Sequence, residues 1–309
     1  MKYIKEMKAN DKLDDVYLLK EMKVAQTKSG GDYYIITLAD KTGTLDCRIW
    51  DTDGIALFDK LEYVHVKGNV SDYNGTLQAK IYSIEKTSAY DVSDYMPVSK
   101  YSISSMIKKL FEYIDSVENG YLKALLTDIF TDKGYLEDFE KKSAASSVHH
   151  AFVGGLLQHT LEVTKTCAFL ANNYQILNKD LIVTAAILHD IGKTRELTAL
   201  PENAYSDEGN LIGHIVIGVE IIDDSVRNIE GFPEELAVQL KHCILAHHGE
   251  LEWGSPKKPA LIEAQMLHFA DNISAKMEAY TELFETEPED GDWYGFQKAL
   301  GGRIRKTVI

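Results

Sequence analysis

Hydrophobic, β-branched and aromatic residues gather along the first third of the chain in short runs, which are separated by polar turn residues. These β-rich runs cover segments 33–38, 44–50, 63–70 and 77–82, with turns indicated at 40–43 and at Asn74-Gly75. In segment 44–50, Leu45, Cys47 and Ile49 share one face, and the polar residues alternate with them. Short strands about ten residues apart predict a small barrel or sandwich. A five-stranded Greek-key barrel fits about 75 residues of this kind.

The pattern changes near residue 90, where hydrophobic residues begin to recur at helical spacing. A polar stretch over 91–100 separates the two patterns. Helices are predicted over 106–114, 122–130, 150–174, 181–190, 212–228, 233–247 and 260–285, with Asn, Gly and Pro between them. We therefore expect a multidomain chain with a β-barrel over 1–90, a helical linker region over 91–148, and an all-α bundle with a C-terminal extension over 149–309.

The charge balance limits how this chain can hold an anionic partner. Its 309 residues include 33 Lys+Arg and 48 Asp+Glu, for a net charge of −15. That balance argues against a broad basic surface for nucleic acid. The acidity is uneven, however: residues 1–90 carry 13 basic and 14 acidic residues, and residues 91–309 carry 20 and 34. The near-neutral barrel is therefore the part suited to weak, sequence-independent binding of a strand.

Other classes of protein are disfavoured by the sequence. No stretch approaches the roughly 18 apolar residues of a membrane span, and the first residues lack the apolar core of a signal peptide. The three cysteines, Cys47, Cys167 and Cys243, are far apart and lie in apolar patterns. They indicate buried thiols in a reducing compartment. We expect a cytoplasmic protein with no membrane partner, and a homo-oligomer remains open.

Nine of the ten histidines fall in the helical half, where several adjoin one another or an aspartate. The ordered set is His159, His189-Asp190, His214, His247-His248 and Asp271. Each neutral imidazole offers one lone pair to a metal, and a carboxylate can bridge two ions. Ligands drawn from five helices would converge on the interior of a bundle. The set predicts a metal centre, whereas a lone histidine such as His65, His242 or His268 is more simply explained as a structural or surface residue.

This ordered set resembles that of the HD-domain metal-dependent phosphohydrolases, an all-helical superfamily named after its His-Asp pair. The resemblance implies one metal at His159, His189, Asp190 and Asp271, and a second at Asp190, His214, His247 and His248. Within His189-Asp190-Ile191-Gly192-Lys193, it implies that Asp190 and Lys193 act in catalysis, with Lys193 neutralising charge on a phosphate. His150 is a further candidate for a substrate contact. The continuation over 249–256 lacks the Gly-Tyr-Pro element of the cyclic-dinucleotide phosphodiesterases, so that branch is disfavoured.

The predicted barrel indicates which family within the HD superfamily the chain resembles. Segment 34–43 followed by 49–51 is similar to a nucleic-acid-binding OB-fold, and a barrel followed by an HD domain resembles the YhaM-type 3′–5′ exoribonucleases. Segment 149–160 matches the start of the HD domain in that family. The resemblance implies hydrolysis of single-stranded RNA from the 3′ end, with single-stranded DNA as a second candidate substrate. Candidate strand contacts, chosen as aromatic or basic residues on the outer face, are Arg48, Trp50, Lys80, Tyr82, Tyr33 and Tyr73.

Two divalent ions per chain are expected, with Mn²⁺ favoured over Mg²⁺ because imidazole ligands dominate, and with Co²⁺, Fe²⁺ and Ni²⁺ as further candidates. Two other functions remain open. One is a phosphohydrolase for a small nucleotide, with the barrel as a regulatory or assembly module. The other is a non-catalytic protein that binds single-stranded nucleic acid, although the full ligand set argues against an inactive HD domain.

Overall fold

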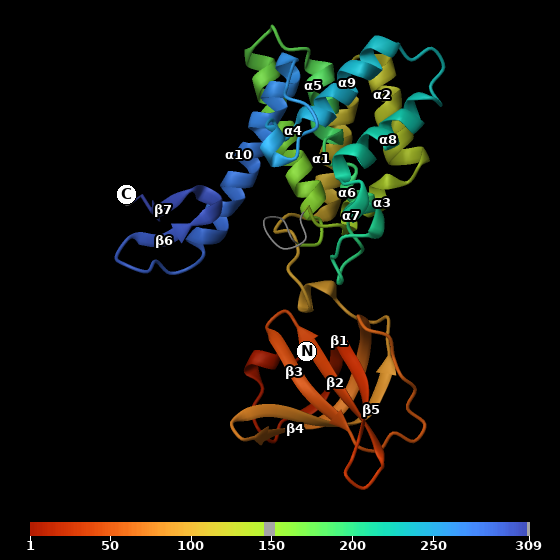
Figure 1. The fold of residues 1–309 in the computed structure, drawn as a ribbon, viewed down its shortest axis with the longest axis vertical. Coiled ribbons are helices and arrows are strands. Elements are labelled where there is room, and N and C mark those ends of the chain that lie inside the picture. Colours follow the sequence, from red (N-terminus) through yellow and green to blue (C-terminus); the bar gives the residue numbers. More distant parts are fainter. Residues whose placement is uncertain (145–151, 308–309) are drawn as a thin grey trace. The chain divides into compact units, whose positions relative to one another are not determined.

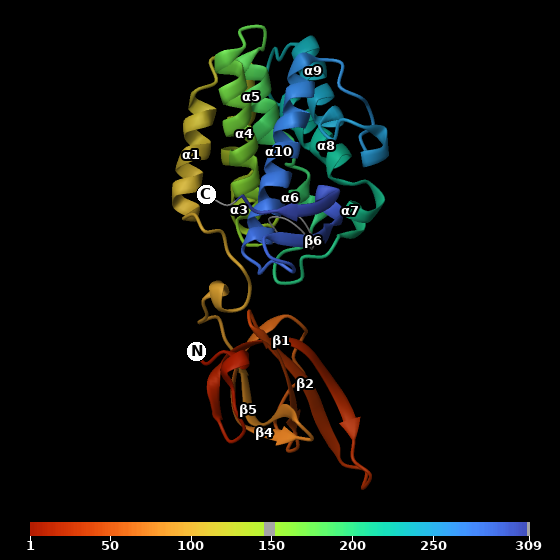
Figure 2. The ribbon, with the colours of Figure 1, turned by 90° about the vertical axis from the view of Figure 1, so that its left-hand side faces the viewer.

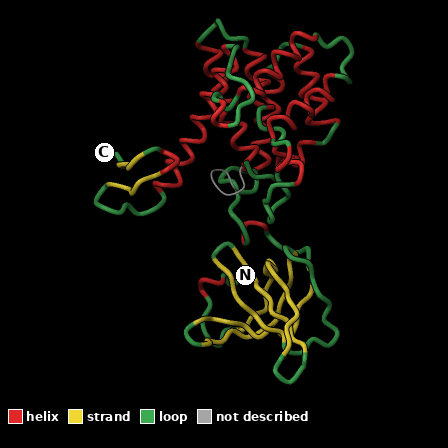
Figure 3. The backbone as a smooth tube through the Cα atoms, in the orientation of Figure 1, coloured by secondary structure: helices red, strands yellow, loops and turns green. Residues whose placement is uncertain are grey.

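The computed structural model describes residues 1–144 and 152–307, and it divides into two units, Met1–Val98 and Ser99–Ile309. Strands make up the first unit and helices most of the second (Figure 3). Residues just after the predicted barrel belong with it: Tyr95 packs on Leu18 and Ala39, and its hydroxyl donates to the carbonyl of Val16 at 3.0 Å. Among the described residues, no helix is both long and apolar enough to span a bilayer.

The first unit is a closed barrel of five strands (Figure 1). The strands are β1 (Lys12–Gln26), β2 (Asp32–Asp40), β3 (Gly43–Ile49), β4 (Glu62–Tyr73) and β5 (Thr76–Lys86), with short 3₁₀ turns η1 (Ile4–Glu6) and η2 (Val92–Asp94) beside them. Their order around the barrel is β1-β2-β3-β5-β4. β3 and β5 pair in parallel, and the other neighbours pair antiparallel. The predicted five-stranded OB-fold barrel is confirmed.

Alternate side chains of the strands point inward and form the core of the barrel. Leu45, Cys47 and Ile49 are buried inside, as their shared face predicts. The turn at Asn74-Gly75 joins β4 to β5 with both residues at positive φ, 54° and 82°, the conformation of a tight hairpin. Gly68 lies at the bulge in β4, where a Cβ atom would come within 2.5 Å of the Lys80 carbonyl. Only glycine therefore allows the two strands to approach this closely.

The second unit is a bundle built around the long helices α4, α5 and α10, and α1, α4 and α10 run side by side in Figure 2. The helices are α1 (Ile103–Asp115), α2 (Gly120–Thr127), α3 (Tyr135–Lys141), α4 (Gly155–Asn173), α5 (Lys179–Leu188), α6 (Lys193–Glu196), α7 (Asp207–Leu211), α8 (His214–Val226), α9 (Glu234–Ala246) and α10 (Ile262–Phe284), with turns η3 (Asp128–Asp132) and η4 (Leu251–Trp253). Each of the seven predicted helical segments overlaps one of these helices over most of its length.

Helix α5 is the centre of this bundle. Every residue from Leu181 to Leu188 is buried, which explains why the segment is apolar on all sides rather than on one stripe. The predicted all-α HD bundle is confirmed, and the C-terminal extension that follows it contains strands. There, β6 (Trp293–Gln297) and β7 (Gly302–Arg305) form a two-stranded antiparallel sheet around η5 (Lys298–Leu300). These strands are too short for their period to stand out in the sequence.

Candidate metal centre

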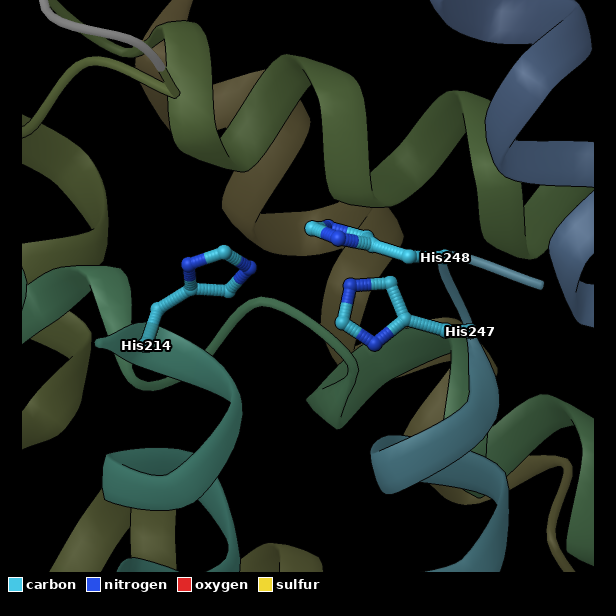
Figure 4. Close-up of side chains that lie close together, drawn as sticks. All are labelled: His214, His247 and His248. Atoms are coloured by element: carbon cyan, nitrogen blue, oxygen red, sulfur yellow. The ribbon is translucent and has the colours of Figure 1, made fainter. Parts of the chain in front are cut away.

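Five helices bring the predicted ligands together in the second unit. His159 lies on α4, and His189 and Asp190 follow the last residue of α5. His214 is the first residue of α8, and Asp271 lies within α10. His247 and His248 follow the end of α9 and face His214 (Figure 4). All seven predicted ligands therefore meet at one place, although the first and the last of them, His159 and Asp271, are 112 positions apart in the sequence.

The ligand atoms form two groups. In the first, those of His159, His189 and Asp271 lie within 4.8 Å of one another, and in the second, those of His214, His247 and His248 do so. Asp190 lies between the groups. Its Oδ2 atom is 3.4 Å from Nε2 of both His159 and His189. Its Oδ1 atom is 3.6 Å from Nε2 of His214 and 3.8 Å from Nε2 of His247.

Hydrogen bonds on the far side of each ring fix the direction in which it offers a lone pair. Nδ1 donates to a backbone carbonyl in His189 (Ala186, 2.8 Å), His247 (Ile244, 2.7 Å) and His248 (Trp253, 2.9 Å). Nδ1 of His214 donates to the Glu196 carboxylate at 2.9 Å. Each of these rings is therefore held with Nε2 as the ligand atom, as is typical of metal-binding histidines.

His159 is oriented by a relay of side chains. Its Nδ1 atom lies 3.1 Å from Oγ of Ser274, and that hydroxyl donates to Glu162 at 2.8 Å. Because the Ser274 proton is given to Glu162, the serine oxygen accepts from His159, and Nε2 of His159 carries a lone pair. Nε2 of His189 carries one as well, and the two nitrogens are 3.1 Å apart. A cation between these two nitrogens would favour their close approach, and ligands about 2.1 Å from one ion can have this spacing.

Buried polar atoms support the same conclusion. Within the described part of the chain, Oδ1 of Asp190 and Nε2 of His214 and His247 are buried without a hydrogen-bond partner. Leaving such atoms unpaired costs about 1–3 kcal/mol each. The two nitrogens lie 3.6 and 3.8 Å from that oxygen, so the three atoms gather at one place. The donor set of imidazole and carboxylate suits a divalent ion, so the residues fit the metal that the sequence predicts.

The charges in the site match this use. Burial by itself would raise the pKa of Asp190, but Lys193 and His189 outweigh it and hold the pKa well below its usual range. Burial, together with His189 and His248, holds the pKa of His247 well below its usual value. The carboxylate is therefore ionised and His247 neutral at neutral pH, which are the forms that bind metals. Nζ of Lys193 lies 2.8 Å from Oδ2 of Asp190, at the edge of the centre.

Gly192, which lies between the His-Asp pair and Lys193, allows the backbone to pass very close to α8. A Cβ atom at this position would lie 2.0 Å from the His214 carbonyl and 2.7 Å from the Gly218 nitrogen. The turn after α5 therefore packs directly on the first turn of α8. That contact brings His214 to the side of Asp190.

Sequence reasoning missed the residues that support the ligands. Glu196 accepts from both Nδ1 and the backbone N–H of His214, each at 2.9 Å, and is buried. Ser274 and Glu162 orient His159. Lys142 is also buried, and its ammonium donates to the carbonyls of Thr194 and Leu197 at the end of α6. For Glu196, the sequence offered only an acidic residue three positions after Lys193 as a signal of a supporting role. Nothing in the sequence marks Ser274 as a partner of His159.

The predicted strand contacts lie in the barrel unit. Tyr33 stacks on Trp50 with ring centroids 4.6 Å apart. Arg48 and Lys80 are neighbours across the parallel β3–β5 register. Trp50 and Tyr82 are about half exposed. These five residues come from the adjacent strands β2, β3 and β5 or their ends. Tyr73 is exposed at the β4–β5 hairpin, away from this group in the strand register. His150 lies outside the described residues.

The family model for the HD domain matches residues 156–276, which include all seven ligands. The 3′–5′ exoribonuclease YhaM of Geobacillus sp. (strain WCH70) is 35% identical over 277 residues, covering 88% of this chain and 85% of that protein. The one from Halalkalibacterium halodurans is 33% identical over 296 residues, covering 94% and 91%. The chain belongs to the YhaM family of 3′–5′ exoribonucleases. This YhaM-family member is thus a hydrolase with an HD domain, and the HD domain together with its His/Asp groups indicates divalent-metal binding.

Solved structures similar to the YhaM-family barrel include the second OB-fold domain of replication protein A from Methanococcus maripaludis. That domain is 19% identical, covers 29% of this chain and 97% of its own, and gives a TM-score of 0.25. The OB-fold assignment made above rests instead on strand order and pairing.

Proposed function

We propose that this chain removes nucleotides one at a time from the 3′ end of single-stranded RNA, at a centre holding two divalent metal ions. The observation that carries the proposal is the position of Asp190, with each carboxylate oxygen turned to a different group of ligands. His159, His189, Asp190 and Asp271 would hold one ion, and Asp190, His214, His247 and His248 the other. The 3′–5′ direction is taken from the names of the relatives.

The side chains of the centre have distinct tasks in this proposal. Bound divalent ions would polarise the phosphoryl oxygens and lower the pKa of water to supply hydroxide. Asp190, with one oxygen toward each group, would be a ligand shared by the two sites. Lys193, which neutralises Asp190 at 2.8 Å, also lies where it can neutralise charge that grows on the phosphate. Because five of the seven ligands are imidazoles, Mn²⁺ is favoured over Mg²⁺.

The outer face of β2, β3 and β5 is proposed to hold the strand. The stacked pair of Tyr33 and Trp50 offers an aromatic surface for bases, and Arg48, Lys80 and Tyr82 lie on the neighbouring strands. OB-folds bind single strands through such aromatic and basic groups on these strands. No residue of this group is a specific reader of a 2′-hydroxyl, so single-stranded DNA is proposed as a second substrate.

A cytoplasmic location is part of the proposal. All three cysteines are buried free thiols in the structure, as suits a reducing compartment.

The central test is digestion of single-stranded RNA labelled at either end, with Mn²⁺ added to metal-free protein. We expect 3′ label to appear at once as a mononucleotide and 5′ label to appear as a ladder of shortening products. The variants His189→Ala and Asp190→Ala should lose at least a hundredfold in rate, because each removes a ligand. His242→Ala, which changes a histidine of α9 outside the centre, is the matched control.

Wild-type rates in both ligand variants would contradict the proposal. Hydrolysis of mononucleotides with no loss of RNA would favour the small-nucleotide phosphohydrolase instead. For the barrel, the double variant Arg48→Ala/Trp50→Ala should weaken RNA binding and raise KM with kcat unchanged, as measured by anisotropy and kinetics. Unchanged binding would remove the strand-holding role.

A further inference from the structure

A cavity of about 250 Å³ adjoins the metal centre on the side of His248 and Asp271. Besides these two ligands, its lining residues are Trp253, His268, Asn272 and Ala275. None of the four is a predicted metal ligand. The cavity therefore extends the centre with side chains of a different kind, two aromatic rings and an amide.

Trp253 lies on a short loop that is fixed at several points. Its backbone N–H donates to Glu250 at 3.0 Å, and its carbonyl accepts from Nδ1 of His248 at 2.9 Å. Ser255, which is buried, hydrogen-bonds the carbonyls of Leu245 and Lys257. The indole nevertheless remains 56% exposed. A large aromatic side chain held on a rigid loop, open to solvent and next to a metal ligand, is already arranged to bind a flat partner.

His268 completes the wall of the cavity. Its Nδ1 atom donates to the His247 carbonyl at 2.9 Å, and its ring centroid lies 5.7 Å from that of Trp253. Gly249, with φ of 80°, passes over this ring, and a Cβ atom there would lie 2.4 Å from Cε1 of His268. A glycine after the paired histidines is therefore needed to bring the Trp253 loop and the His268 ring into contact.

We propose that this cavity binds the base of the 3′-terminal nucleotide, the one released, against the indole of Trp253. The inference rests on the proposed function, since it assumes a nucleotide whose phosphate lies at the metal ligands. Stacking on an aromatic ring suits any base, and the Asn272 amide can both donate and accept at the edge of a base. A volume near the lower end for ligand pockets admits one base rather than several.

The kinetic test compares Trp253→Ala, Trp253→Phe and Leu251→Ala on two RNA substrates, one ordinary and one with an abasic 3′-terminal residue. Leu251 is the matched control, since it is an exposed apolar residue of the same 3₁₀ turn that does not line the cavity. Loss of one stacked base corresponds to about a tenfold to hundredfold change in KM. We expect that rise for Trp253→Ala on ordinary RNA, with Trp253→Phe and Leu251→Ala close to wild type.

On abasic RNA the wild type should show the same rise, and Trp253→Ala should add nothing to it. Equal rates for wild type and Trp253→Ala on ordinary RNA would overturn the inference, as would an equal loss from Trp253→Ala on both substrates. The second result, with metal missing from the variant, would mean that Trp253 serves to hold His248. Failure of the wild type to degrade any RNA would instead refute the proposed function.

A spectroscopic readout does not depend on turnover. In a Trp50→Phe/Trp293→Phe background, Trp253 is the sole tryptophan. Adenosine 5′-monophosphate should quench its fluorescence in the Mg²⁺-loaded protein, and ribose 5-phosphate, which lacks the base, should not. An equal response to both compounds would contradict stacking on this residue.

Discussion

Glu196 offers a sharp test of the second ligand group, because it holds His214 without touching the space between the ligands. One oxygen of its carboxylate accepts from both Nδ1 and the backbone N–H of His214, at 2.9 Å each. Burial would raise the pKa of Glu196, but its hydrogen bonds with His214 outweigh this and lower it. Glu196 is therefore ionised at neutral pH. The substitution Glu196→Gln keeps the shape of the side chain and removes only its charge.

The size of the effect follows from these two hydrogen bonds. A hydrogen bond to a charged group contributes about 1.5–3 kcal/mol, and one between neutral groups about 0.5–1.5 kcal/mol. The glutamine oxygen can still accept, so the loss at the imidazole is about 1–1.5 kcal/mol. That corresponds to roughly a tenfold weaker metal affinity, at the low end for residues that support metal ligands. The first group, which Glu196 does not contact in the structure, should keep its affinity.

Calorimetric titration of the metal-free protein with Mn²⁺ measures this directly. We expect two binding events in the wild type, and Glu196→Gln should weaken one of them and spare the other. Glu208→Gln is the matched control, because Glu208 binds Arg195 close by and does not contact His214. Thermal unfolding of the metal-free variants separates misfolding from loss of affinity. Unchanged affinities in a folded Glu196→Gln variant would refute the role assigned to Glu196 and the reasoning behind it.

Three further predictions address other parts of the second unit. Ser274→Ala should weaken metal binding at the first group about tenfold, with melting temperatures matched to the buried control Ser225→Ala; equal affinity in the two variants would contradict the relay to His159. Gly192→Ala should lower the free energy of unfolding by about 1–3 kcal/mol and weaken the second group in urea and metal titrations, whereas Gly120→Ala, with open space around it, should do neither. Burial, Glu162 and Glu282 raise the pKa of Glu278 above 4.5, so its charge destabilises the folded state above that raised pKa and not below pH 4.5. Glu278→Gln should therefore raise the free energy of unfolding at pH 7.5 by about 0.5 kcal/mol or less, measured as a higher melting temperature, and leave both unchanged at pH 4; a gain at both pH values would point to another cause.

The barrel shows which strands a sequence pattern can locate. β3 alternates cleanly because one face is buried and the other is open. β1 is the longest of the described strands, but only its first half carries buried residues, and its register shifts between Leu19 and Glu21. The buried residues are Leu13, Tyr17, Leu18 and Leu19. No single period runs through it, so its position did not stand out. The short helices α6 and α7 are missed for a related reason, since four or five residues are too few to establish a helical repeat.

The ligands were predictable because their residue types and order are unusual. His189-Asp190 ends an apolar helix, where a charge needs a partner. Glu196 and Ser274 are ordinary residue types at ordinary positions. Ser274 is 115 residues from His159, and only the packing of α10 on α4 brings them into contact. In the sequence, Trp253 stood out only as part of the segment 249–256, which lacks the Gly-Tyr-Pro element of another branch of the superfamily. Its exposed position beside His248 is seen only in the structure.

The predicted metal ligands come from five helices of the described bundle, α4, α5, α8, α9 and α10, or from the residues directly after them. Bound ions would therefore cross-link five separate segments, as a disulfide links two, and this cross-link would depend on the supply of metal. Ligand binding to the native state alone adds to its stability by mass action. Scarcity of metal would thus reduce the lifetime of the folded enzyme as well as its turnover, and a cell could regulate its amount through the same ions that make it active.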